Sequence, residues 1–270
     1  MKILTMSRHR RKETANLTGQ FPAPSHADHF LVRDTTVIAP DGSTIAMLLT
    51  QRIDPELWRL AFMSWRGVRE LPRKRATAVG SPSLPALRKD GSLSKRVGVP
   101  SSVLKFLEES GVGYGLLGYT AATAKHPCHM TALTKRRPEL IDGNQRLIER
   151  VNELYAQYMP AAYAIQRAEV EKAPRWRVLN TVFTTIYIIK NLRTAYHSDR
   201  NLPGAMTAML PMGNFTGGGL VLPEWRIAIA YRPGDLLLFD EGQLHGNLPF
   251  KGERLAAVFY YARGIADCGK

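Results

Sequence analysis

The stretch LNTVFTTIYIIKNL at 179–192 runs directly into YHSDRN at 196–201, and this junction decides how the rest of the chain is interpreted. The first segment is rich in β-branched residues, which favour strands. In a strand, the two-residue spacing of His197 and Asp199 places both side chains on one face. His245 follows in GQLHGN, and Arg254 follows in KGERLAAVFYYAR.

Short β-like runs punctuated by glycine and proline fill the region after Asp199. They are AMTAMLPMG (205–213), GGGLVLP (217–223), RIAIAY (226–231), LLLF (236–239), LHGNLPF (244–250) and RLAAVFYYAR (254–263). Such runs indicate a compact antiparallel barrel or sandwich. We therefore expect an α+β protein whose core is a double-stranded β-helix (jelly-roll or cupin-like) of about residues 175–263, braced by helices.

Two imidazoles and one carboxylate facing one point are the ligand set of non-haem Fe(II) oxygenases, which leave coordination positions open for a cosubstrate and O2. An arginine on the following strand could bind a cosubstrate carboxylate bidentately. The alternative is a pair of structural histidines. A second His-x-Asp, His26 and Asp28, has no strand context of this kind and carries no such prediction.

HSDRNLPG, FTGGGLVLPE, YRPGDLLLFDEGQLHGN and KGERLAAVFYYAR together resemble the catalytic core of the Fe(II)/2-oxoglutarate dioxygenases, and more narrowly the TET/JBP family, which oxidises methyl groups of pyrimidine bases in nucleic acid. The resemblance implies His197, Asp199 and His245 as catalytic iron ligands and Arg254 as the anchor of the 2-oxoglutarate C5 carboxylate. The family usually carries serine two residues after that arginine, whereas this chain has Ala256.

Further contacts are predicted around this core. Arg193 and Asn191, just before the histidine, are candidates for cosubstrate binding. The candidates for substrate binding are Asn201, Tyr196, Asn247 and Trp225. The expected cofactors are Fe(II), 2-oxoglutarate and O2.

The formal net charge of +14 suits a polyanionic partner, although a merely soluble basic protein would also show it. The first hundred residues supply much of this excess, with 17 Lys and Arg against 8 Asp and Glu. The predicted partner is duplex DNA with its target base flipped out of the stack. No protein partner is implied.

Along the chain, residues 1–25 are predicted to be a flexible basic arm, and residues 26–270 are predicted to be a single dioxygenase domain. Within that domain we expect a β-hairpin around Pro40, a helix capped by Asp54, a serine-capped helix at 101–110, and helices from 138 to 172. The segment 69–101, rich in Pro, Gly, Ser and cations, is predicted to be a loop that contacts nucleic acid or a solvated linker.

Two cysteines, Cys128 and Cys268, give no disulfide framework, so a reducing interior is expected. His126, Cys128 and His129 lack a second ligand pair at zinc-finger spacing and are interpreted as incidental. No membrane span or secretory signal is evident, so we expect a soluble, intracellular protein.

The function predicted from these residues and the resemblance is oxidation of 5-methylcytosine in DNA to 5-hydroxymethylcytosine. The alternatives are a 2-oxoglutarate-dependent hydroxylase of thymine, of a protein side chain or of a small metabolite, and a non-catalytic barrel that binds nucleic acid.

Overall fold

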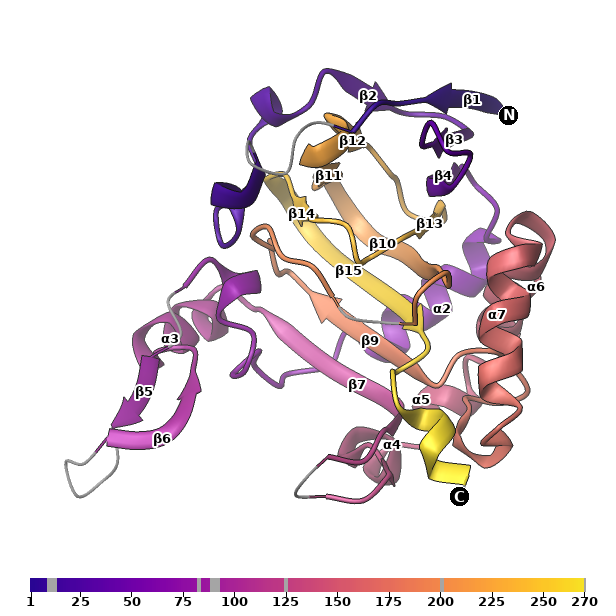
Figure 1. The fold of residues 1–270 in the computed structure, drawn as a ribbon. Helices are drawn as coiled ribbons and strands as arrows, with labels where there is room; N and C mark the ends of the chain where they lie inside the picture. The colour runs from indigo at the N-terminus through magenta and orange to yellow at the C-terminus, as the bar shows by residue number, and fades with distance from the viewer. Residues whose placement is uncertain (9–13, 82–83, 88–92, 124–125, 200–201, 270) are drawn as a thin grey trace.

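A large and a small β-sheet form the body of the protein in the computed structural model, which describes the chain except residues 9–13, 82–83, 88–92, 124–125, 200–201 and 270. The large sheet has the strand order β1-β3-β4-β13-β10-β15-β9-β7-β8, and the small sheet has the order β14-β11-β12-β2. Helices pack beside the large sheet, and the β5–β6 hairpin projects from the body near α3 (Figure 1). The predicted α+β fold with a double-stranded β-helix core is confirmed.

The strands are β1 Lys2–Thr5, β2 His29–Leu31, β3 Thr35–Ile38, β4 Thr44–Leu49, β5 Leu84–Leu87, β6 Leu93–Gly98, β7 Gly113–Thr120, β8 His129–Met130, β9 Thr185–Lys190, β10 Thr207–Gly217, β11 Leu220–Leu222, β12 Ile227–Ile229, β13 Leu236–Phe239, β14 Gly246–Asn247 and β15 Phe250–Tyr260. The α-helices are α2 Pro55–Trp65, α3 Ser101–Glu109, α4 Ala132–Arg136, α5 Glu139–Asp142, α6 Gln145–Tyr158 and α7 Pro160–Val170. Short 3-10 turns are η1 Ala15–Leu17, η2 Pro24–His26, η3 Thr77–Val79, η4 Pro174–Trp176, η5 Pro223–Trp225 and η6 Ile265–Gly269.

Alternation along the central strands divides the core into two layers. On β15, Leu255, Ala257 and Phe259 belong to the cluster shared with α2, α6 and α7. Ala256 and Val258 belong to the cluster between the two sheets. Because successive strand side chains point to opposite faces, Arg254 has the parity of Ala256 and lies on the face between the sheets.

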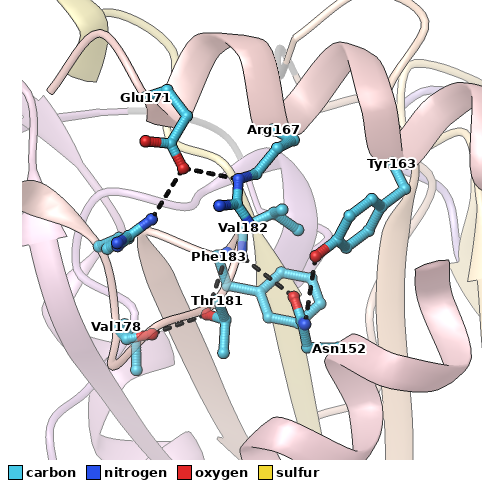
Figure 2. Close-up of polar contacts among 9 residues, drawn as sticks. Asn152, Tyr163, Arg167, Glu171, Val178, Thr181, Val182 and Phe183 are labelled. Carbon is cyan, nitrogen blue, oxygen red and sulfur yellow. Dashed lines mark hydrogen bonds and ion pairs between the residues drawn. The ribbon is translucent and has the colours of Figure 1, made fainter. Parts of the chain in front are cut away.

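The helices α6 and α7 hold the segment that leads into β9 (Figure 2). Asn152 on α6 accepts a hydrogen bond from the Val182 backbone N–H at 3.0 Å and donates to the Tyr163 hydroxyl on α7 at 3.3 Å. Glu171 pairs with Arg167 and with Arg177. These contacts fix the start of β9, the strand that precedes His197.

Several local predictions are confirmed. The β3–β4 hairpin is present, with the Asp41 carboxylate accepting from the Ser43 N–H in its turn at 2.9 Å. Asp54 caps α2 by accepting from the Glu56 N–H at 2.7 Å. Trp65 on this helix is fully buried in the core.

Other predictions need correction. The helix α3 begins at Ser101 with Pro100 in the capping position, so the expected serine cap is absent. Within the supposed flexible arm, β1 pairs in parallel with β3, because its backbone groups find partners at the edge of the large sheet. The loop predicted at 69–101 contains η3 and the β5–β6 pair. Among the described residues, no helix combines the length and apolar character needed to cross a bilayer.

The two cysteines, from which no disulfide framework could be read, are joined in a disulfide between Cys128 and Cys268. The bond links the segment before β8 to η6, across a sequence separation of 140 residues. Sequence could not reveal this, because the pairing depends on where the C-terminal turn lies in space.

Reducing this disulfide should lower the free energy of unfolding by about 2 to 5 kcal/mol, because a long loop in the unfolded chain is released. The measurement is urea unfolding with and without dithiothreitol. The Cys128→Ser/Cys268→Ser double variant serves as control and should be as stable as the reduced wild type and insensitive to the reductant. An equal midpoint for oxidised and reduced wild type would contradict the prediction.

Candidate functional site

A reciprocal backbone bridge brings the two histidines together. The His197 N–H donates to the His245 carbonyl at 3.0 Å, and the His245 N–H donates to the His197 carbonyl at 2.9 Å. The ring centroids are 4.4 Å apart. The two histidines, far apart in the sequence, face each other across this bridge. They therefore present both imidazoles to one point between the sheets.

Both imidazoles are oriented by main-chain carbonyls. Nδ1 of His197 lies 2.8 Å from the Ala195 carbonyl, and Nδ1 of His245 lies 2.8 Å from the Gln243 carbonyl. A carbonyl can only accept, so each Nδ1 donates its hydrogen there, which leaves Nε2 as the candidate metal-binding atom of each ring. Hydrogen bonds of this kind fix the tautomer of metal-binding histidines.

Asp199 completes the cluster from the same chain segment as His197. Its N–H donates to the Glu241 carbonyl at 3.0 Å, which holds it opposite the turn after β13. Ligand atoms of Asp199, His197 and His245 all lie within 4.8 Å of one another. Two imidazole nitrogens and one carboxylate oxygen, with one side open, are donors that fit Fe(II).

Arg75 lies against this carboxylate. Its Nη1 is 3.2 Å from Asp199 Oδ1, and its guanidinium stands over the Tyr187 ring at 4.7 Å. Burial works to raise the pKa of Asp199, but the hydrogen bond to His197 and the charge of Arg75 outweigh burial and hold that pKa well below its usual range. Asp199 is thus an anion at neutral pH.

Two further ionisable groups have shifted pKa values. Burial, followed by the neighbouring His197, lowers the pKa of His245 to about 4, so that this ring is neutral and able to bind a metal. Burial, followed by the charge of Asp199, raises the pKa of Glu241 to about 8. Glu241 Oε1 is buried and has no hydrogen-bond partner among the described residues.

Replacing Glu241 by glutamine should stabilise the metal-free protein increasingly as pH rises from about 5 to 8. The folded-state pKa of Glu241 lies above its ordinary value. The contribution of Glu241 to the free energy of unfolding is therefore fully present at pH values below the ordinary pKa, and it is lost as pH rises toward about 8. Glutamine never ionises and avoids this loss, which should exceed about 1 kcal/mol at pH 8. Urea unfolding of both proteins at the two pH values measures the difference. A difference in the free energy of unfolding that does not depend on pH would contradict the raised pKa of Glu241. The pH dependence that His245 contributes has the opposite sign and is the same in both proteins, so it cancels in the comparison.

Two cavities meet at the cluster. The smaller, of about 50 Å³, lies between the sheets. It is lined by Arg75, Ala78, Tyr187, Ile189, Leu192, Thr194, His197, Asp199, Met209, Leu220, Phe239, Glu241, His245, Asn247 and Val258. The larger, of about 410 Å³, is open to solvent and includes Met206, Thr207, Gln243 and Arg263. Asp199 and Glu241 line both, so the cluster stands between an inner and an outer space.

Arg254 lies behind the inner cavity. It is 3% exposed, and its Nη1 donates to the Leu192 carbonyl at 3.3 Å. Its Nε is buried without a partner, and within the described part of the chain no carboxylate pairs with it. A buried cation without an anion is costly, so this position fits the carboxylate of a ligand.

Residues 115–263 match the family described as Tet_JBP, the oxygenase domain of the 2OGFeDO superfamily. The match covers more than half of the chain and contains the His197, Asp199 and His245 cluster and Arg254. The chain belongs to the Tet_JBP family.

This chain is similar to parts of longer curated relatives. A bifunctional helicase and thymine dioxygenase JBP2 from Trypanosoma brucei brucei is 35% identical over 162 residues, which is 56% of this chain and 15% of the relative. A thymine dioxygenase JBP1 from Crithidia fasciculata is 26% identical over 167 residues, covering 58% of this chain and 20% of the relative. This Tet_JBP chain therefore spans only a small part of the relatives it matches.

Among solved structures, NgTET1 in complex with 5mC DNA has the same fold. The TM-score is 0.57 with 17% sequence identity, and the superposition covers 88% of this chain and 79% of NgTET1. This likeness concerns the fold of the Tet_JBP chain.

The remaining cosubstrate candidates of the Tet_JBP chain face its scaffold. Asn191 has a left-handed backbone (φ 52°), and its side-chain oxygen accepts from the Arg254 N–H at 3.0 Å. Arg193 donates to the carbonyls of Pro22 and Asn247 and stands over the Phe21 ring. Neither side chain lines the two cavities at the cluster. Both hold the loop that leads to His197.

The predicted substrate contacts are dispersed. Asn247 lines the inner cavity, with its side chain bonded to Thr194 and Tyr231. Tyr196 is fully buried in another cluster with its hydroxyl 3.0 Å from His26 Nδ1, because neighbouring residues of an extended segment face opposite ways. Trp225 is also buried, and its Nε1 donates to Gln243 at 3.1 Å. The structure thus offers neither ring as a platform for a base, and Asn201 lies outside the described residues.

Sequence reasoning missed Arg75, which it assigned to a basic nucleic-acid loop. Neighbouring Arg73 and Lys74 are exposed, whereas Arg75 turns inward to Asp199. No pattern in the local sequence distinguishes one cation of this run from the others. The contact depends on η3 lying beside the start of the His197 segment, where the Ala195 N–H donates to the Ala78 carbonyl at 2.8 Å.

Proposed function

We propose that this protein is an Fe(II)- and 2-oxoglutarate-dependent dioxygenase that oxidises the 5-methyl group of a pyrimidine base in DNA. The observation that carries the proposal is the position of the His197, Asp199 and His245 cluster between an inner and an outer cavity. Family membership supports the same cofactors, and the curated relatives are thymine dioxygenases.

His197, Asp199 and His245 would hold the iron through Nε2, a carboxylate oxygen and Nε2. Together, iron, 2-oxoglutarate and O2 supply the oxidation of a C–H bond, with succinate and CO2 as co-products. Arg75 keeps Asp199 ionised and oriented, and the carbonyls of Ala195 and Gln243 keep both imidazoles in the ligating tautomer. Arg254 would hold the distal carboxylate of the cosubstrate. Apolar groups such as Leu192, Leu220 and Phe239 keep water out of the inner cavity.

The outer cavity is the place for the target base. Its volume of about 410 Å³ and its opening beside Asp199 allow a flat heterocycle to reach the cluster. A methyl group stacked inside a duplex is out of reach, so the base must leave the helix. The inner cavity is too small for this role at about 50 Å³.

Thymine and 5-methylcytosine are the two candidate substrates, since both carry the methyl group at C5 and differ at C4. The names of the curated relatives favour thymine, and the sequence-based prediction favoured 5-methylcytosine. A net charge of +14 supports DNA as the carrier of either base.

The deciding experiment incubates matched duplexes with the protein, Fe(II), 2-oxoglutarate and O2, followed by nucleoside mass spectrometry. One duplex contains thymine at a single position, one 5-methylcytosine and one cytosine. Formation of 5-hydroxymethyluracil identifies thymine, and formation of 5-hydroxymethylcytosine identifies 5-methylcytosine. If neither product forms and succinate release does not depend on His197, the proposal is overturned. Succinate release that does depend on His197 keeps the oxygenase and rejects these bases.

Cations around η3 are predicted to contact the DNA backbone. Deleting the whole loop would also remove Arg75 from the site, so the sharper variant replaces only the exposed Arg69, Arg73 and Lys74 by alanine. Fluorescence anisotropy at two salt concentrations should show weaker DNA binding and a shallower salt dependence. The matched control replaces Arg146 and Arg150 on α6. Unchanged affinity and salt slope in the η3 variant would reject this interface.

A further inference from the structure

The hydroxyl of Tyr231 is the centre of a buried polar group beside Arg254. It accepts a hydrogen bond from Arg254 Nη2 at 2.6 Å and another from Asn247 Nδ2 at 2.8 Å. It donates its own hydrogen to the Gly218 carbonyl at 2.6 Å. Tyr231 is 3% exposed, and burial raises its pKa, so the hydroxyl is neutral and keeps its hydrogen.

This group lies next to the inner cavity. Asn247 lines that cavity, as do His197, Asp199 and His245, and Leu192, whose carbonyl accepts from Arg254, lines it as well. The three metal-binding residues and Asn247 thus line one cavity, and Arg254 and Tyr231 are each hydrogen-bonded to a residue that lines it. A ligand with a chelating group at one end and an anion at the other matches this arrangement of charge.

Arg254 has no hydroxyl neighbour on its own strand. The next side chain on the same face of β15 is Ala256, which offers only a methyl group. Around the guanidinium stand the rings of Phe215, Tyr231 and Phe250, at 6.0, 5.5 and 5.4 Å from the guanidinium carbon. Tyr231 is the one of these three rings that carries a polar atom, and that atom points at Arg254.

We propose that Tyr231 and Arg254 together bind the distal carboxylate of the cosubstrate, with Tyr231 supplying the hydroxyl that β15 lacks. This inference rests on the proposed function. When the carboxylate enters, the Tyr231 hydrogen turns from the Gly218 carbonyl to a carboxylate oxygen, while Arg254 and Asn247 continue to donate to the phenolic oxygen. The Gly218 carbonyl keeps a partner, because Asn247 Nδ2 also donates to it at 3.1 Å.

Gly218 is suited to this exchange. It has a φ of +76°, and a Cβ at this position would meet Arg254 Cδ at 3.3 Å and Phe250 Cβ at 3.2 Å. A side chain here would be strained by the positive φ and crowded against Arg254 and Phe250, so glycine favours this approach of the carbonyl to the Tyr231 hydroxyl. The inner cavity is smaller than a five-carbon dicarboxylate, so side chains on its wall must move on binding. Arg75 lines this cavity, and its side chain is 31% exposed, which leaves it room to move.

A purely structural role for Tyr231 makes a different prediction. If the hydroxyl only fixes the turn at Gly218, its loss should affect every ligand of the metal equally. If it binds the distal carboxylate, its loss should affect 2-oxoglutarate and spare 2-oxobutyrate, which has the same chelating 2-oxo acid end and no second carboxylate.

The test measures binding to the whole chain loaded with Mn(II), without O2, by isothermal titration calorimetry. The ligands are 2-oxoglutarate and 2-oxobutyrate, and the proteins are the wild type, Tyr231→Phe and the control Tyr119→Phe. Tyr119 lies in a separate cluster, packed on Trp176. Mn(II) titration and thermal melting of each protein check that the metal site and fold are retained.

We expect Tyr231→Phe to weaken 2-oxoglutarate binding about tenfold or more, as for loss of a hydrogen bond to a charged group. Binding of 2-oxobutyrate and Mn(II) should stay within about twofold of the wild type, and Tyr119→Phe should change neither. Equal loss for both acids, or no loss for either, overturns the role of Tyr231. Failure of the wild type itself to bind 2-oxoglutarate instead rejects the proposed cosubstrate, and with it this inference.

Discussion

Asp199→Ala is expected to abolish turnover and to weaken binding of Fe(II), or of Mn(II) in its place, by at least about a hundredfold. The change removes the only carboxylate of the three-membered cluster and leaves two imidazoles. The fold should persist, because the Asp199 N–H still donates to the Glu241 carbonyl and the His197–His245 bridge is made by the main chain. Metal titration and nucleoside mass spectrometry measure the two effects.

Asp28→Ala is the matched control, since Asp28 belongs to the other His-x-Asp pair of the chain. Its carboxylate pairs with Arg226 at the surface. Metal affinity and turnover of this variant should equal those of the wild type. Full metal affinity in Asp199→Ala, with an unchanged melting temperature, would show that the cluster is not the metal site.

Arg254→Met should weaken 2-oxoglutarate binding by at least about a hundredfold, because a buried, charge-assisted contact to a carboxylate is lost. The free energy of unfolding should stay equal or rise. The guanidinium is buried without a carboxylate partner among the described residues, and methionine can fill the space between Phe215, Phe250 and Tyr231 with favourable sulfur–aromatic contacts.

Calorimetry with Mn(II)-loaded protein and urea unfolding test the two halves of this prediction. Arg66→Met is the control, since this arginine also stands over an aromatic ring, that of Phe62 at 5.4 Å, but pairs with Glu253 at the surface. It should leave 2-oxoglutarate affinity unchanged. A stable Arg254→Met protein that still binds the cosubstrate tightly would remove Arg254 from the site.

The cluster was predictable because local and distant signals agreed. A β-branched run before His197 and the two-residue spacing to Asp199 indicated one face of a strand, and the resemblance of later segments supplied His245 and Arg254. The structure brings His197, Asp199 and His245 together and places Arg254 behind the inner cavity that they line. It also shows that a lone backbone bridge after β9, and not a continuous strand, holds His197.

Other parts of the site depend on contacts that local sequence does not encode. Arg75 reaches Asp199 from 124 positions away, and Tyr231 reaches Arg254 from 23 positions away, with β13 and β14 between them. The Cys128–Cys268 pairing depends likewise on the path of the whole chain. By contrast, the burial of Tyr196 could have been foreseen, since a residue next to His197 in an extended segment faces the opposite side.

The reciprocal bridge between His197 and His245 has a consequence for how metal and fold are coupled. Bringing the ends of the long segment between these residues together costs conformational entropy. Two main-chain hydrogen bonds and the packing of the sheets offset this cost in the metal-free protein. A metal that finds its ligands prearranged spends little of its binding free energy on ordering the chain. The ion should therefore leave and return without unfolding the protein, so that occupancy follows the free concentration of Fe(II) in the surroundings.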